Sequence, residues 1–115
     1  MIKENIDCWY EILISLDNGV IDFIKEEAKK AGIAKPVLLI MDCGCIMNQE
    51  TVELDIKEKG SEEGYEFYMK KEGVEFYVNP KVRHLADKGR ISVVPYGANR
   101  FRRLDFNPLD PTANP

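Results

Sequence analysis

The strongest constraint on the fold is a stretch in which apolar and polar side chains alternate strictly, TVELDIK at residues 51–57. Successive side chains of a strand point to opposite faces of its sheet, so this pattern predicts a half-buried antiparallel strand. Two further segments, 65–69 and 74–78, are predicted strands, and the glycine-containing stretches 59–64 and 70–73 are predicted turns. The middle of the chain should therefore be a sheet joined by short connections.

Two segments have the features of helices. Residues 18–31 carry apolar side chains at three- and four-residue steps, with Asp17 as the expected N-cap and Gly32 just after the expected end. Residues 80–88 follow an Asn-Pro pair, which is typical of a helix start, and Gly89 is expected to close them. We therefore expect one longer and one shorter helix.

The remaining strands fix the predicted fold class. The apolar run Val37–Met41 is expected to be a central strand buried on both faces. Residues 91–96 and 100–106 are predicted strands joined by a turn at 97–99. The chain is thus predicted to be mainly β, α+β by content, as a small β-sandwich or curled mixed sheet with two packed helices. The side chains expected beneath the helices are Val52, Leu54, Ile56, Val74, Phe76 and Val78.

The chain length of 115 residues predicts one domain. Residues 1–13 are expected to form an N-terminal arm or an extra strand, and residues 14–106 the folded domain. Residues 107–115, NPLDPTANP, contain three prolines and almost no apolar residues, so they are expected to be a flexible tail.

Composition excludes several classes of function. The net charge of −4 and the isoelectric point near 5.1 argue against nucleic-acid binding. The longest apolar run is too short for a membrane span, and the N-terminus lacks the features of a signal peptide, so a cytoplasmic protein is expected. Acidic residues dominate positions 50–75 and basic residues dominate positions 79–103. Both blocks are interpreted as solvated faces, with docking to an acidic partner or to a second copy as the weaker alternative.

The candidate site is the Cys-Gly-Cys sequence formed by Cys43, Gly44 and Cys45. A disulfide between extended residues at this spacing would be strained, whereas two thiolates can converge on one metal ion where glycine lets the backbone bend. Thiolates favour zinc, copper(I) and iron–sulfur clusters, which normally take four ligands. The further ligands are expected from a second copy of the chain, with Cys8 and His84 as less certain contributors.

Two other interpretations of the cysteines stay open. The pair could form a thiol redox centre in which one cysteine attacks and the other resolves. Alternatively, Cys43 and Cys45 are small buried packing residues and the protein is an interaction module. No paired acid and base defines a substrate pocket, so a non-enzymatic, metal-binding function is preferred.

Two stretches of the sequence resemble a known family. ISLDNGVIDFIKEEAKKAGIAKPVLLIMDCGC is similar to the opening helix, first strand and first cysteine of the HesB-like domain, which is the domain of the A-type iron–sulfur carriers. GVEFYVNPKVRHLADKGRISV is similar to that domain's later strand, short helix and following strand. The resemblance covers roughly residues 14–106. It implies a HesB-like fold and an iron–sulfur cluster, iron or zinc held by Cys43 and Cys45.

The sequence departs from that family in where its cysteines lie. A-type carriers have a single cysteine at the first position and a Cys-Gly-Cys near the C-terminus, whereas here the Cys-Gly-Cys is at 43–45 and RRLDFNPLDPTANP contains no cysteine. The chain looks closer to a branch with paired cysteines, or cysteine and selenocysteine, at the first position. That resemblance implies a homodimer and protein partners in iron–sulfur or selenium and sulfur metabolism.

Overall fold

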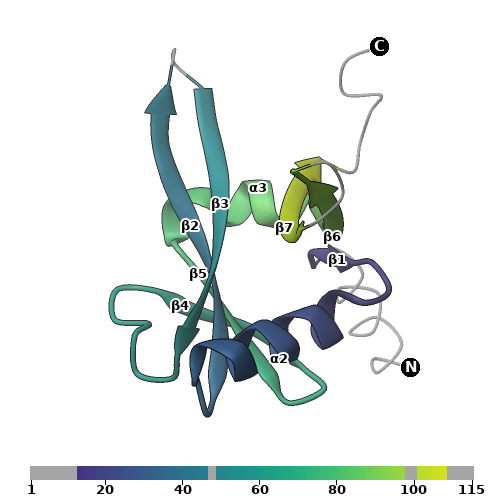
Figure 1. Ribbon diagram of the computed structural model, residues 1–115. Coiled ribbons are helices and arrows are strands. Elements are labelled where there is room, and N and C mark those ends of the chain that lie inside the picture. The colour runs from purple at the N-terminus through teal and green to yellow at the C-terminus, as the bar shows by residue number, and fades with distance from the viewer. Residues whose placement is uncertain (1–12, 47–48, 98–100, 109–115) are drawn as a thin grey trace, which may run out of the picture.

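The computed structural model describes residues 13–46, 49–97 and 101–108, and at 44–46, 49–51, 96 and 108 it describes the backbone alone. Strands make up most of the regular structure, and the two helical segments pack beside them (Figure 1). The mainly β prediction is confirmed. The elements in chain order are β1 (Ser15–Leu16), α2 (Val20–Ala31), β2 (Pro36–Ile46), β3 (Gln49–Glu58), β4 (Glu66–Lys71), β5 (Val74–Val78), the 3₁₀ helix η1 (Pro80–Val82), α3 (Arg83–Ala86), β6 (Gly89–Tyr96) and β7 (Phe101–Pro108).

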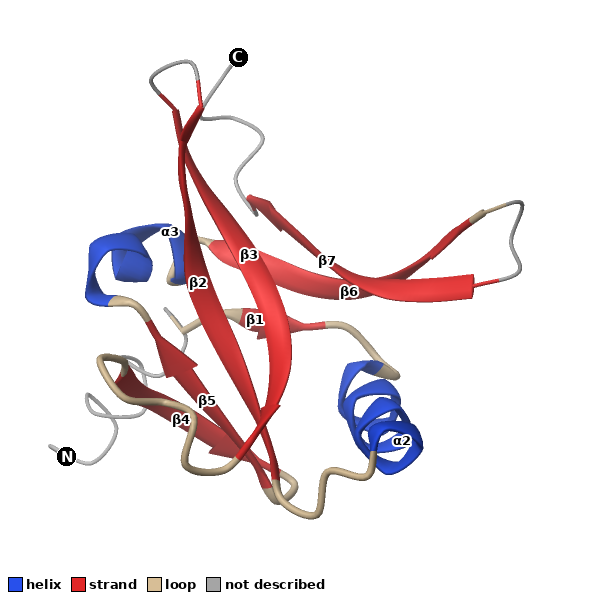
Figure 2. Ribbon diagram, turned by 60° about the vertical axis from the view of Figure 1, so that its left-hand side comes forward, coloured by secondary structure: helices blue, strands red, loops and turns tan. Residues whose placement is uncertain are grey.

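The strands form two mixed sheets. The larger has the order β3-β2-β5-β4, in which β2 and β5 are parallel and the other neighbours are antiparallel. The smaller has the order β1-β6-β7, in which β1 is parallel to β6 and β7 is antiparallel to it. Figure 2 shows β2 and β3 crossing the direction of β6 and β7, with α2 beside them.

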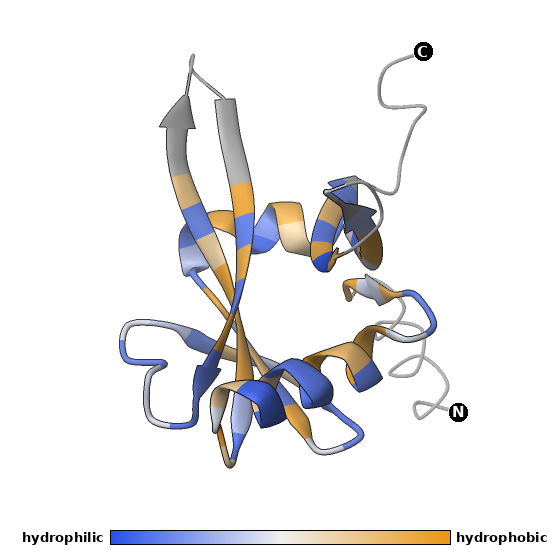
Figure 3. Ribbon diagram, viewed as in Figure 1, coloured by the Kyte–Doolittle hydropathy of each residue, from blue (hydrophilic) through white to orange (hydrophobic). Residues whose placement is uncertain are grey.

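The main core lies between the larger sheet, α2 and β6. The central strand is buried as predicted, since the side chains of Val37–Ile40 are at most 4% exposed. The predicted core residues of β5, which are Val74, Phe76 and Val78, are fully buried. Those of β3 are half-buried and pack against the same cluster, and the alternation of apolar and polar residues along β3 is visible in Figure 3.

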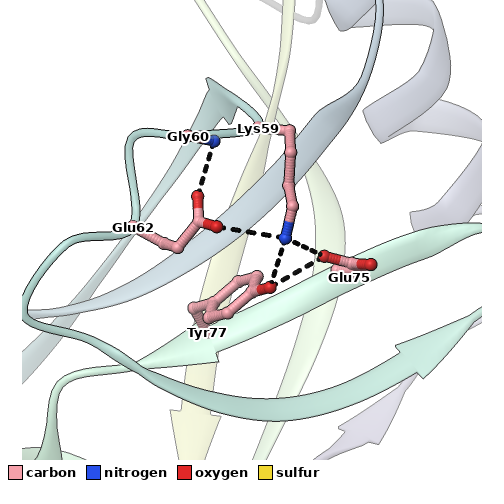
Figure 4. Close-up of polar contacts among 5 residues, drawn as sticks. All are labelled: Lys59, Gly60, Glu62, Glu75 and Tyr77. Atoms are coloured by element: carbon pink, nitrogen blue, oxygen red, sulfur yellow. Dashed lines mark hydrogen bonds and ion pairs between the residues drawn. The ribbon is translucent and has the colours of Figure 1, made fainter.

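A smaller cluster covers the other face of β2, where Val37 and Leu39 contact Tyr77. A polar network closes the sheet next to this cluster (Figure 4). The Lys59 ammonium donates to the Tyr77 hydroxyl at 2.7 Å and to Glu75 Oε1 at 2.8 Å, and Tyr77 also donates to Glu75 at 2.8 Å. These bonds raise the pKa of Lys59 and lower that of Glu75. The central strand is therefore covered on both faces.

One buried polar group ties the smaller sheet to the larger one. The Tyr68 hydroxyl accepts a hydrogen bond from the Ile14 amide at 2.8 Å and donates one to Asp87 Oδ1 at 2.6 Å. Burial first, and the Asp87 carboxylate second, raise the pKa of Tyr68. The phenol therefore stays protonated and can make both bonds.

The helix termini match the prediction only in part. Gly32 follows α2 in the left-handed conformation, as expected, and the Asn79 side chain accepts from the Lys81 amide at 2.9 Å. The expectation for Asp17 was wrong: the N-cap of α2 is Gly19, at φ +91°, and the Asp17 carboxylate lies 3.4 Å from Arg90 Nε instead. A glycine takes this position because L side chains rarely adopt positive φ.

Gly89 also has a different role from the one predicted. It begins β6 and does not close the preceding helix. A Cβ at this position would overlap the ring of Phe106, so the absence of a side chain at Gly89 leaves the space that this ring occupies.

Both predicted domain boundaries fall near the limits of the described residues. β7 continues to Pro108, which pairs with Gly89, so strand structure extends two residues beyond the predicted boundary at 106. Residues 1–12 of the predicted arm and residues 109–115 of the predicted tail lie outside the described residues. Within the described residues, no helix has the length and apolar character needed to cross a membrane.

Candidate functional site

Cys43 and Cys45 lie within strand β2. β2 runs to Ile46 and β3 begins at Gln49, so the strand continues five residues beyond the predicted Val37–Met41 and Cys43–Cys45 belong to a long hairpin. The last residue of β2 that pairs with β5 is Ile40, opposite Val78. Beyond it, the described part of β2 pairs with β3 alone. We call this two-stranded part, residues 41–46 and 49–53, the cysteine ribbon; in Figure 1 it extends beyond the rest of the larger sheet.

The pairing of the cysteine ribbon is irregular at the cysteines. Asp42 is opposite Val52 and Cys45 is opposite Glu50, so β2 has one residue more than β3 over this interval. The extra residue falls at Cys43–Gly44 and forms a β-bulge, which bends the strand locally. Regular alternation of side chains does not hold across a bulge. The sequence spacing of the two cysteines therefore does not by itself define their relative orientation.

The Cys43 side chain is exposed and its thiol is free. The interpretation of Cys43 as a buried packing residue is therefore wrong. The side chain of Cys45 and the whole of Cys8 lie outside the described residues, so their predicted part in metal binding stays a prediction. The structure places one predicted ligand in an accessible position and leaves the geometry of the pair open.

An ion pair that the sequence analysis did not find lies next to Cys43. Lys81 Nζ is 3.9 Å from the carboxylate of Asp42, whose side chain is only 22% exposed. The parallel pairing of β2 and β5 explains this proximity, because the segment that follows β5 lies beside the point where β2 leaves the sheet. The Asn79 amide donates to the Ile40 carbonyl at 2.9 Å and fixes that turn. The Asn-Pro helix start was visible in the sequence, but the parallel pairing that brings it to Asp42 was not.

His84 is exposed on α3. Across residues 13–46, 49–97 and 101–108, excluding side chains not described, no group of three or more His, Cys, Asp or Glu residues could hold a metal ion. His84 as a ligand thus stays a prediction.

A groove of about 570 Å³ lies between α2, β3 and β7 and reaches the base of the cysteine ribbon at Val52 and Glu53. Its lining includes five consecutive residues of β3, Val52–Ile56, and five of β7, Arg102–Phe106. Neither Cys43 nor His84 lines it. The groove is therefore a separate feature from the candidate thiolate site.

Comparisons with known proteins identify a shared fold. No family model and no curated protein matches the sequence. The chain is similar to a solution NMR structure of a protein from Aquifex aeolicus, determined by a structural genomics consortium, with a TM-score of 0.58 and 17% sequence identity. The match covers 84% of this chain and 92% of the other. At this identity the similarity shows the fold alone. The match spans nearly all of the Aquifex aeolicus protein.

Proposed function

We propose that this protein binds a soft metal ion or an iron–sulfur cluster through the thiolates of Cys43 and Cys45. The observation that carries the proposal is the exposed, free thiol of Cys43 at a β-bulge in the cysteine ribbon. A metal ion can reach such a thiol from solution, and binding displaces its proton. The bulge also supplies the local bend of the backbone that two cysteines at this spacing need in order to share one ion.

The accessible position of Cys43 favours a carrier or presenting role over a closed structural site. Two cysteines supply two of the four ligands that zinc or a cluster normally takes. The other ligands come from a second molecule that contacts the cysteine ribbon, which is a small thiol or a cysteine of another protein chain. A second copy, or a partner in iron–sulfur or selenium and sulfur metabolism, fits the resemblance of residues 14–106 to the HesB-like domain.

The test is metal content in matched variants. Protein purified without oxygen is loaded with ferrous iron and sulfide, or with zinc, and the metal-to-chain ratio and visible absorption are measured. Cys43→Ser and Cys45→Ser should each lose most of the metal, and the double variant should lose little more, because one ion needs both thiolates. Cys8→Ser tests separately whether Cys8 supplies a further ligand, since this variant should lose metal only if Cys8 takes part.

The same samples separate the alternatives. Retention of metal in the double variant contradicts the proposal. A metal-free wild type that forms a reversible 43–45 disulfide indicates the redox alternative, and a mixed disulfide should then be trapped when one cysteine is removed. With zinc, one ion per chain means that each chain holds its own ion, whereas one ion per two chains means that two copies share it.

A further inference from the structure

The outer edge of β3 pairs with no other strand among the described residues. β3 is the last strand of the larger sheet, and only its inner edge pairs with a described strand, β2. Every second residue of such an edge strand directs its N–H and C=O groups away from the sheet. The groove of about 570 Å³ runs along this edge, because residues from both faces of β3 line it. In Figure 2, α2 and β7 lie on this side of β3.

The side chains of β3 differ sharply between its two faces. Leu54 and Ile56 are half-buried against the main core. The opposite face is charged, and its charges are ordered along the strand: acids at positions 53 and 55, then a lysine at 57, with Lys59 just beyond the end of the strand. Asp55 and Lys57 are about half exposed, at 44% and 50%, and their charged groups lie 3.3 Å apart. Opposite charges are thus placed on either side of Ile56.

From this order of charges we propose that the outer edge of β3 pairs with the same edge of a second copy of this chain. In an antiparallel pair with Ile56 on the twofold axis, Asp55 faces Lys57 of the second copy, and Lys57 faces its Asp55. Two acids and two lysines then alternate around the axis. Opposite charges across a strand pair are favourable and like charges are unfavourable, so this register is self-complementary.

The other contacts agree with this register. Ile56 meets its own copy on the core side, which adds apolar contact beside the groove. Lys59 is already held by Glu75 and Tyr77, so the charge match depends on Asp55 and Lys57 alone. Exposed charge pairs select a register more than they add affinity, whereas the backbone bonds of the extended sheet hold the strands together.

This dimer would separate the two cysteine ribbons. Cys45 is opposite Glu50, six residues from Ile56, so this pair lies about 20 Å from the axis at roughly 3.4 Å per residue. The ribbons therefore lie at opposite ends of the dimer, and each remains open to a different molecule. The proposal concerns a different surface from the cysteines and does not depend on metal binding.

The test is the oligomeric state of charge variants by sedimentation equilibrium, with circular dichroism as the check on folding. The wild type should be a dimer. Asp55→Lys and Lys57→Asp each place like charges across the axis, and each should raise the dissociation constant about tenfold or more. A mixture of these two variants should form a heterodimer, because every facing pair is then opposite in charge. The double variant should also regain the dimer.

Matched controls exclude a general effect of net charge. Glu63→Lys and Lys88→Asp make the same changes of charge at exposed positions away from β3 and should leave the dimer intact. A monomeric wild type at every concentration overturns the proposal. Equal dimer strength in Asp55→Lys and the wild type, or a failure of the two folded variants to associate with each other, overturns it as well.

Discussion

The two halves of β2 have the same neighbour on one edge and entirely different surroundings elsewhere. Val37–Ile40 lie between β3 and β5, with apolar clusters on both faces. From Met41 onward the described strand pairs with β3 alone, and within three residues a cysteine is exposed. One continuous strand thus joins a fully buried segment to an exposed thiol.

The difference shows how a small domain can present reactive groups without losing its core. A two-stranded ribbon is only marginally stable in water by itself. The cysteine ribbon is held because its base continues into the buried half of β2 and because the Asn79 amide donates to the Ile40 carbonyl at that base. The core therefore provides the stability, and the exposed residues of the cysteine ribbon are available for binding.

The largest expected effect contrasts Ile40 with Cys43. Ile40 is fully buried, so Ile40→Ala removes apolar contacts and leaves a cavity, and it should lower the free energy of unfolding by about 2–5 kcal/mol. Cys43→Ala is the matched control, because Cys43 is exposed, and in metal-free protein it should change that free energy by less than about 0.5 kcal/mol. Urea unfolding of both variants measures this difference. Similar losses in the two variants would contradict the division of β2 into two halves.

Sequence reasoning predicted the buried half of β2 because the signals there are local. Apolar residues without alternation indicate a strand covered on both faces, and positions 37–40 are so covered. Gly32 and Asn79 were also predicted correctly, since their roles depend on the adjacent helix alone.

The features that sequence reasoning missed depend on partners distant in the chain. Asp42–Ile46 have no alternating pattern, and β3 alone keeps them extended past a bulge. Gly89 resembled a helix terminator because its real constraint, the ring of Phe106, comes from another strand. The position of Lys81 beside Asp42 likewise depends on the parallel pairing of β2 with β5, which no local pattern specifies.

A smaller effect is expected from a polar group in the buried region. Tyr68→Phe removes the acceptor of the Ile14 amide and the donor to Asp87, and Ile14 itself is buried. A buried donor left without its partner destabilises by about 1–3 kcal/mol, which sets the expected loss. Tyr65→Phe is the control, because Tyr65 is only half-buried, at the edge of the smaller cluster. Thermal unfolding compares the two, and equal stability of Tyr68→Phe and wild type would show that the hydroxyl is dispensable.

The smallest effect is expected from the polar network of Lys59, Glu75 and Tyr77, which lies next to the smaller apolar cluster on β2. The Lys59 ammonium, and then the Tyr77 hydroxyl, lower the pKa of Glu75 below its ordinary value of 4.5. A carboxyl with a lowered pKa in the folded state adds stability above that ordinary value and loses it as the pH falls through the folded pKa. Glu75→Gln should therefore be slightly less stable than the wild type at neutral pH, and the difference should shrink as the solution is acidified. The effect is small because water and salt screen exposed ion pairs.

Urea unfolding at neutral and at acidic pH measures the network's contribution, with Glu63→Gln as the control. Glu63 is exposed in the same connection between β3 and β4, and its substitution removes one charge without touching Lys59 or Tyr77. If Glu75→Gln and Glu63→Gln have the same free energy of unfolding at both pH values, the bonds of Lys59 and Tyr77 to the Glu75 carboxylate do not stabilise the fold. The apolar contacts of Val37 and Leu39 with Tyr77 would then account for the closure of this face without the polar network. A pH-dependent difference that Glu63→Gln lacks would instead show that the Glu75 carboxylate and its partners add to the stability of the face of β2 that carries the smaller cluster.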